Sequence, residues 1–129
     1  MTDRAAVLLV EDDESLRRIL AIQLRAAGLT VTGAGSAEEA IELIDGGLRP
    51  TVVLLDVNLP GETGWDFLRG PHLAAAGAPP VVITSATTVS PRRLAEFHVA
   101  GYLPKPCPMD TLVDTIRRLL EPATAEEGR

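Results

Sequence analysis

A run of apolar residues that stops at an acid decides the fold: residues 51–61 read TVVLLDVNLPG. Five uncharged residues rich in valine and leucine predict a strand that is buried on both faces. Asp56 follows directly, and Pro60-Gly61 predicts a loop after it. Strands buried on both faces belong to parallel sheets that are covered by helices on each side. The stretch therefore predicts an α/β fold with Asp56 at the carboxyl end of a strand.

Apolar strands and amphipathic helices alternate outward from this segment. Shorter apolar runs predict four more strands, at residues 5–10, 29–33, 81–84 and 101–103. Helical spacing predicts five helices, at about residues 15–27, 37–45, 63–69, 91–97 and 109–120, with a little more helix in 74–78. Ser15 is expected to cap the first helix and Gly28 to stop it, and Leu16, Ile19, Leu20 and Leu24 recur along it at helical spacing.

Five strands alternating with five helices predict one parallel sheet with helices on both faces, joined by right-handed crossovers. We expect the flavodoxin-like, doubly wound strand order 2-1-3-4-5, which is a general rule for such sheets and is not worked out from this sequence. The expected domain spans residues 1–122, and residues 123–129 are expected to form a flexible C-terminal tail.

Length and charge limit the possible functions. The chain of 129 residues suits one domain, and that length leaves no room for a separate DNA-binding domain of usual size. The net charge is −6, without a basic stripe, so neither nucleic acid nor a membrane is an expected partner. The short apolar run near the N-terminus resembles neither a signal peptide nor a membrane span, and the single Cys107 allows no internal disulfide. The expected location is the cytoplasm.

Polar side chains stand where the expected strands end. They are Glu11 and Asp12 after the first strand, Asp56 after the third, Ser85 after the fourth and Lys105 shortly after the fifth. Sites in open α/β sheets form beyond the carboxyl ends of the strands, at the topological switch point. These residues are therefore expected to share one cleft. Thr84 is the rival of Ser85, although strand alternation points its side chain the other way.

Such a cleft has a definite chemistry. Clustered carboxylates repel one another unless a cation lies between them, and Mg²⁺ suits an all-oxygen site that can also hold waters and phosphate. The expected cofactor is therefore Mg²⁺, for which Mn²⁺ could substitute. A carboxylate can attack phosphorus, so Asp56 is the candidate nucleophile for an aspartyl phosphate. Lys105 would neutralise phosphoryl oxygens, and Ser85 would donate a hydrogen bond to the new phosphate.

Four segments resemble the receiver domains of bacterial two-component response regulators. They are residues 7–14 (VLLVEDDE), 55–61 (LDVNLPG), 84–86 (TSA) and 102–106 (YLPKP). They occur in order and with family-like spacing over about residues 5–121. The resemblance implies that Asp56 is the phosphoacceptor and that the metal site consists of Glu11, Asp12, Asp56 and the backbone carbonyl of Asn58. Within the acidic pair, Asp12 is favoured over Glu11 as the direct ligand. The resemblance also implies Ser85 as switch hydroxyl, Lys105 as phosphate-binding lysine, Tyr102 as aromatic switch and a cis Lys105–Pro106 bond.

The function implied by this resemblance is a signalling switch rather than a conventional enzyme. A sensor histidine kinase or a histidine phosphotransfer protein would present a phosphohistidine, and the chain would catalyse its own Mg²⁺-dependent phosphorylation and dephosphorylation. The face of the fourth helix, fifth strand and fifth helix would then bind a downstream protein or a second copy. The residues expected on that face are Arg92, Arg93, Tyr102, Arg117 and Arg118, although ordinary solvated arginines are an equal alternative.

Two other function classes stay open from the sequence. A phosphatase or phosphomutase would want an acid where Asn58 stands, and a pseudo-receiver would act only as an interaction module. The chain departs from the receiver pattern at residues 97–100, where Gly-Ala is usual, at Cys107, where an aromatic residue is common, and at Gly70-Pro71, which shortens a helix. The sequence also leaves open whether this is a complete regulator or an excised receiver.

Overall fold

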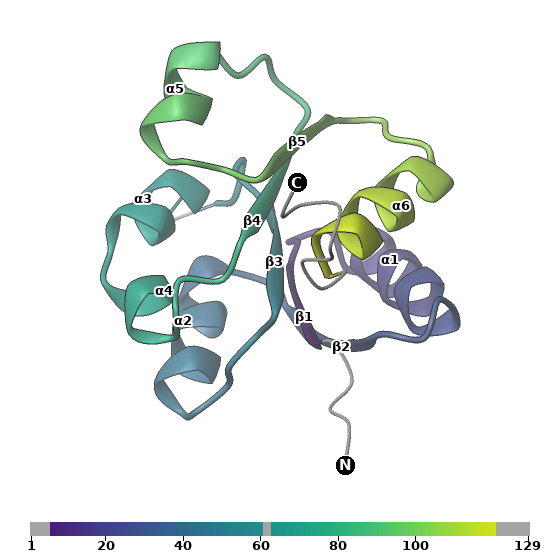
Figure 1. Cartoon of the computed structure of the whole chain (residues 1–129), viewed down its shortest axis with the longest axis horizontal. Helices are drawn as coiled ribbons and strands as arrows, with labels where there is room; N and C mark the ends of the chain where they lie inside the picture. Colours follow the sequence, from purple (N-terminus) through teal and green to yellow (C-terminus); the bar gives the residue numbers. More distant parts are fainter. Residues whose placement is uncertain (1–5, 61–62, 121–129) are drawn as a thin grey trace, which may run out of the picture.

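The computed structural model describes residues 6–60 and 63–120, which form a parallel sheet wrapped by helices (Figure 1). The strands are β1 (Ala6–Val10), β2 (Thr30–Ala34), β3 (Val52–Asp56), β4 (Val81–Ser85) and β5 (Gly101–Pro104). The helices are α1 (Glu14–Ala26), α2 (Ala37–Asp45), α3 (Gly64–Arg69), α4 (His72–Ala75), α5 (Pro91–Glu96) and α6 (Met109–Leu120). Within these ranges, no helix has the length and apolar character needed to span a membrane. The expected domain end at residue 122 and the expected tail lie outside the described residues.

The sheet has the strand order β2-β1-β3-β4-β5, and all neighbouring strands run parallel. The expected doubly wound, flavodoxin-like fold is therefore confirmed. β1 has β2 on one side and β3 on the other, so the direction of winding reverses there. The carboxyl ends of β1 and β3 form the topological switch point, which is where ligands bind in such sheets.

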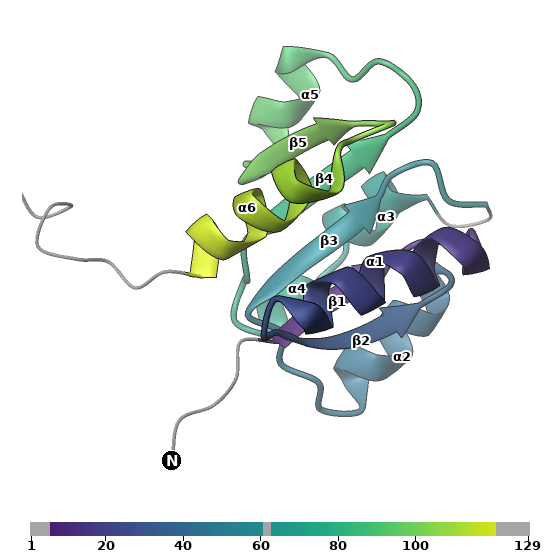
Figure 2. The same cartoon turned by 90° about the vertical axis from the view of Figure 1, so that its right-hand side faces the viewer.

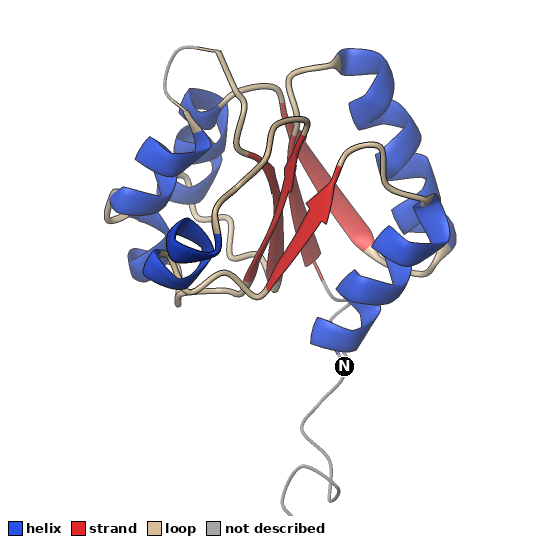
Figure 3. Cartoon of the chain, turned by 90° about the horizontal axis from the view of Figure 1, so that it is seen from above, coloured by secondary structure: helices blue, strands red, loops and turns tan. Residues whose placement is uncertain are grey.

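Two helix layers enclose the sheet, and each layer has its own hydrophobic core (Figures 2 and 3). Leu24 of α1 and Ile116 of α6 are fully buried on one face. The other face is covered by α2, α3, α4 and α5, and Phe67 is the largest side chain fully buried there. Every residue of β3 and β4 is buried. Both faces of these two strands are therefore covered by helices, and their carboxyl ends lie at Asp56 and Ser85.

The start of α1 differs from the prediction. Asp13, not Ser15, is the N-cap, and its carboxylate accepts the backbone N–H of Leu16 at 3.1 Å. Asp and Ser cap helices about equally well, so local sequence does not choose between them. Ile19, one of the four residues at helical spacing, is 50% exposed. The buried stripe of α1 runs through Leu20, Ala21 and Leu24, and Ile19 lies outside it.

A sixth helix, α4, replaces the weak helix expected at residues 74–78. It begins directly after Pro71, whose fixed φ suits the first turn of a helix. Its end is a turn in which Gly77 and Ala78 both have positive φ, so the second half of the predicted range is not helical. The break at Gly70-Pro71 therefore divides the helical segment after β3 into two short helices.

The chain departs from the receiver pattern at residues 97–100, directly after α5, and His98 lies in the turn that these residues form. It has a φ of 52°, and the next residue, Val99, donates its N–H to the carbonyl of Leu94 at 3.3 Å. Gly28 ends α1 in the same way, with a φ of 94° and a bond from Leu29 to Leu24 at 3.2 Å. His98 thus adopts the left-handed conformation that glycine adopts more easily.

Candidate functional site

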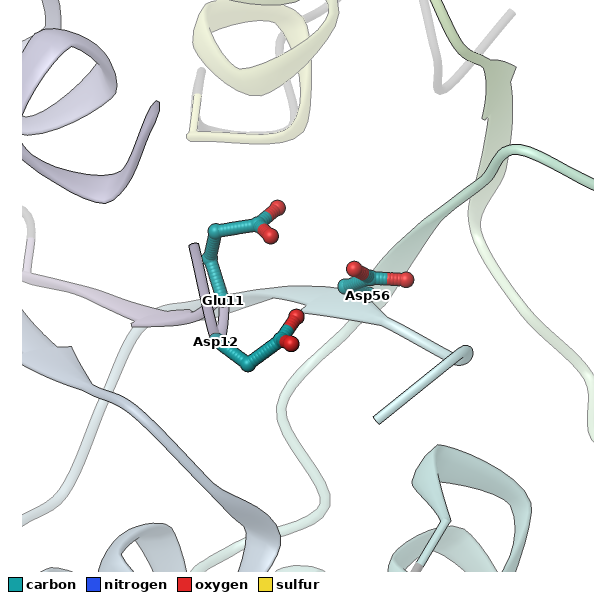
Figure 4. Close-up of side chains that lie close together, drawn as sticks. All are labelled: Glu11, Asp12 and Asp56. Carbon is teal, nitrogen blue, oxygen red and sulfur yellow. The ribbon is translucent and has the colours of Figure 1, made fainter. Parts of the chain in front are cut away.

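Acids from two strands converge at the switch point. Glu11 and Asp12 follow β1, and Asp56 is the last residue of β3. Because Val10 pairs with Leu55, the residues that follow lie side by side. One oxygen of each carboxylate lies within 4.8 Å of the other two, and Figure 4 shows the three side chains facing a common space. Glu11 and Asp56 are 2% and 4% exposed, whereas Asp12 is open to solvent.

Lys105 binds two of these acids. Its Nζ donates to Glu11 Oε1 at 2.9 Å and to Asp56 Oδ2 at 3.0 Å. Burial opposes the ammonium charge, but the hydrogen bonds and charges of Glu11 and Asp56 outweigh it and raise the pKa of Lys105 above its ordinary value. Burial raises the pKa of Glu11, and the hydrogen bond from Lys105 opposes that shift. The structure thus brings together the residues that the sequence placed in one cleft.

The donor set fits a hard divalent cation. Three carboxylates and one lysine leave a negative site, which favours a cation. Both oxygens of Asp56 accept a hydrogen bond, from Lys105 and from the N–H of Asn58, and each keeps a further lone pair. Asp12 and Asp56 are therefore the candidates for direct contact, and Glu11 is buried and bonded to Lys105. The exposure of Asp12 leaves room for the waters that Mg²⁺ usually keeps. The backbone carbonyl of Asn58 as a further ligand stays a prediction.

The side chain of Asn58 joins the loop after β3 to the end of β4. Its backbone N–H donates to Asp56 Oδ1 at 2.8 Å. Its amide oxygen accepts Ser85 Oγ–H at 2.7 Å and the N–H of Ala86 at 3.1 Å, and its Nδ2 donates to Thr87 Oγ1 at 3.2 Å. The sequence does not predict these side-chain hydrogen bonds of Asn58. A sequence signal existed, because an amide two residues after Asp56 and a hydroxyl two residues after Ser85 follow adjacent strand ends.

Ser85, and not Thr84, belongs to this network. The Ser85 hydroxyl has one proton and two acceptors, Asn58 Oδ1 at 2.7 Å and the Thr87 carbonyl at 2.8 Å. The N–H of Thr87 donates back to Ser85 Oγ at 3.0 Å. Thr84 is also buried, but it lines a hollow with Leu16 and Leu112, which Glu11 and Lys105 also line. The expected alternation of the two side chains is therefore present in the structure.

Tyr102 lies at the edge of the network. Its side chain is half-buried, and its hydroxyl donates to the Thr87 carbonyl at 3.5 Å, a long hydrogen bond. The Lys105–Pro106 peptide bond is cis, as the resemblance implies. Cys107 is a half-buried free thiol whose pKa is raised by burial and by the charge of Asp110. A raised thiol pKa disfavours the reactive thiolate.

A doubly wound sheet with lysine-bound acids at its switch point defines an α/β domain of the flavodoxin-like class whose acidic site could hold a divalent cation. The chain belongs to the response regulator receiver domain family, whose model matches residues 7–117. This family consists of phosphoacceptor signalling domains rather than conventional enzymes. Its members bind Mg²⁺ and interact with histidine kinases and with downstream effectors.

The relatives of the chain are response regulators. It is 36% identical over 117 residues to the C4-dicarboxylate transport transcriptional regulatory protein DctD of Pseudomonas aeruginosa, covering 89% of this chain and 25% of that protein. It is 37% identical over 120 residues to the DNA-binding response regulator MtrA of Mycolicibacterium smegmatis, covering 92% of this chain and 52% of that protein. The chain therefore spans between a quarter and about half of these relatives.

Solved structures agree with the fold. The chemotaxis protein CheY4 of Vibrio cholerae superposes with a TM-score of 0.81 at 29% identity. The match covers 91% of this chain and 99% of that chain. The structural likeness therefore extends over nearly the whole receiver domain.

Proposed function

We propose that this receiver domain is a phosphorylation switch in which Asp56 accepts a phosphoryl group from a phosphohistidine. The donor would be a sensor histidine kinase or a histidine phosphotransfer protein. A carboxylate oxygen of Asp56 attacks phosphorus, the P–N bond of the phosphohistidine breaks, and the imidazole leaves with that electron pair. The observation that carries the proposal is the position of Asp56, with one oxygen held by Lys105 at 3.0 Å and the other by the N–H of Asn58 at 2.8 Å.

Asp12 and Asp56 would hold Mg²⁺, with Glu11 supporting the site through its bond to Lys105. When bound, the ion screens the carboxylates from the incoming phosphoryl group and neutralises charge on its oxygens. The residues of the chain orient the nucleophile. The bonds from Lys105 and Asn58 hold the carboxylate of Asp56, and its burial in the sheet keeps it from turning toward solvent.

The switch step follows from the contacts of Ser85. A phosphoryl group on Asp56 offers new acceptor oxygens, and the single proton of Ser85 would turn to one of them. That change breaks its bond to Asn58 or to the Thr87 carbonyl. Since Tyr102 also bonds to the Thr87 carbonyl, the change reaches β5. Phosphorylation would thus shift a two-state equilibrium of the surface formed by α5, β5 and α6.

We infer that the output is a protein contact, with a downstream partner or with a second copy. The output surface comprises Arg92, Arg93, Tyr102, Arg117 and Arg118. Three of the four arginines are exposed, and Arg93 is half-buried because its guanidinium lies 4.9 Å from the ring of Trp65. Arg92 and Arg118 supply positive charge on an otherwise acidic chain and suit an acidic partner surface, whereas Arg117 donates to the Ala27 carbonyl at 3.2 Å, on the side of α6 that faces α1.

Intact-mass measurement after treatment with acetyl phosphate and Mg²⁺ tests the proposal. We expect one added phosphoryl group that is labile to base, and we expect Asp56→Asn to remove it. The matched control is Asp66→Asn, which removes an exposed acid of α3 outside the site. Normal labelling of the Asp56 variant would show that another residue accepts the group. Labelling that persists in chelator would argue against the metal site.

A further inference from the structure

We infer that Arg17 is a positioning residue for the acidic site, because it fixes the backbone that carries Glu11 and Asp12. Arg17 is not proposed to contact the phosphoryl group or the metal. It acts through the backbone of the segment that follows β1. The inference rests on the proposed function, since it concerns the affinity of this site for Mg²⁺.

The carbonyl of Glu11 takes its hydrogen bond from a side chain. The β1–β2 ladder ends with the pair Val10–Ala34, and the N–H of Glu11 still donates to the Ala34 carbonyl at 3.0 Å. The Glu11 carbonyl lies beyond the end of β2 and accepts Nη1 of Arg17 at 2.7 Å. The Arg17 side chain therefore supplies a hydrogen bond to the backbone directly before Asp12, where β2 no longer supplies one. This bond is short and charge-assisted, which makes it one of the stronger kind.

Two glycines leave the space through which Arg17 reaches this carbonyl. A Cβ added at Gly33 would lie 3.3 Å from Arg17 Cδ, and one added at Gly35 would lie 3.2 Å from Arg17 Nη1. Both distances are shorter than ordinary van der Waals contact for carbon. Neither glycine has φ in the left-handed region, so backbone conformation does not require them. Gly33 also weakens an edge strand, and an alanine there would require Arg17 to shift by a few tenths of an ångström.

The expected consequence is a loss of metal affinity when Arg17 is removed. Asp12 is exposed and is held in place chiefly by the backbone on either side of it. Residues that orient metal ligands typically contribute about 10- to 100-fold in affinity. For Arg17 we expect the low end, about tenfold, because Asp13 still anchors the other side of the segment as the N-cap of α1.

The first experiment titrates Mg²⁺ alone and follows backbone amide shifts in the wild-type chain, Arg17→Gln and Arg18→Gln. Arg18 lies next to Arg17 and is 71% exposed, so its variant removes the same charge without removing the bond to Glu11. Charge removal alone would tighten Mg²⁺ binding slightly in both variants. We expect Arg17→Gln instead to weaken it about tenfold and Arg18→Gln to leave it within about twofold. Labelling of Asp56 by acetyl phosphate should recover in Arg17→Gln at saturating Mg²⁺.

The second experiment keeps Arg17 and displaces it. Gly33→Ala should weaken Mg²⁺ binding several-fold in the wild-type background and should have no effect in an Arg17→Ala background. An equal effect in both backgrounds would overturn the inference, because Gly33 would then act without Arg17. If Arg17→Gln binds Mg²⁺ with the same affinity as the wild-type chain, this inference is overturned and the proposed function still stands. A wild-type chain that shows no Mg²⁺ shifts would overturn the proposed function and this inference with it.

Discussion

Replacement of Lys105 by methionine tests how the site balances its charges. The change removes the Nζ that bonds Glu11 at 2.9 Å and Asp56 at 3.0 Å. Two charge-assisted hydrogen bonds of about 1.5–3 kcal/mol each are lost. Part of this loss is offset, because the variant no longer has to desolvate an ammonium group when it folds. Lys105 is 24% exposed, so that desolvation is incomplete in the wild-type chain. We expect the free energy of unfolding at pH 7 to fall by about 2–3 kcal/mol.

Urea unfolding at equal ionic strength measures this change. The midpoint should fall at unchanged m-value, because the surface exposed on unfolding stays the same. Mg²⁺ should restore part of the loss, since a ligand that binds only the folded state stabilises it in proportion to RT ln(1 + [L]/Kd).

Arg18→Met is the matched control for the Lys105 variant. It removes the same charge from an exposed pair with Glu14 and should change the free energy of unfolding by less than about 0.5 kcal/mol. If Lys105→Met were as stable as the wild-type chain, then Lys105 would not be balancing the acids. If Mg²⁺ gave the variant no stabilisation, the acids would not form a Mg²⁺ site.

Three further predictions follow from other contacts. His98→Gly should raise the free energy of unfolding by about 0.5–1 kcal/mol in urea titrations, and Gly28→Ala should lower it by a similar amount, because both residues have positive φ; the opposite signs would contradict this account of the helix ends. Neither Asn58 nor Thr87 is a general base, so self-dephosphorylation should be slow to moderate. Substitution of both residues together should change the lifetime of the phosphorylated form, measured by intact mass, while the Mg²⁺ affinity stays nearly constant. An unchanged lifetime would show that other residues control the access of water. Light scattering of the beryllofluoride-treated chain against the untreated chain tests self-association through the output surface, and specific DNA binding by this chain at physiological salt would contradict the predicted protein contact.

Local sequence determined the strands and the residues of the site. Apolar runs without charge predict central strands, and β3 and β4 are buried throughout. Parallel strands end at one edge, so the sequence alone predicts that Asp12, Asp56 and Lys105 share one cleft. The first inference succeeds because the apolar run of a segment itself indicates burial on both faces. The second succeeds because a helix between two strands makes them run parallel.

Tertiary structure decided the features that depend on two segments at once. Strand order followed a general rule rather than the residues, because any strand here could pair with several others. Asp13 rather than Ser15 caps α1, and Ile19 lies outside the buried stripe, since helix start and rotation are set by packing on the sheet. The bonds from Asn58 to Ser85 and from Arg17 to Glu11 join residues on different elements or across a turn. Periodicity reports which face a side chain occupies, and only the packed fold fixes which atom it meets there.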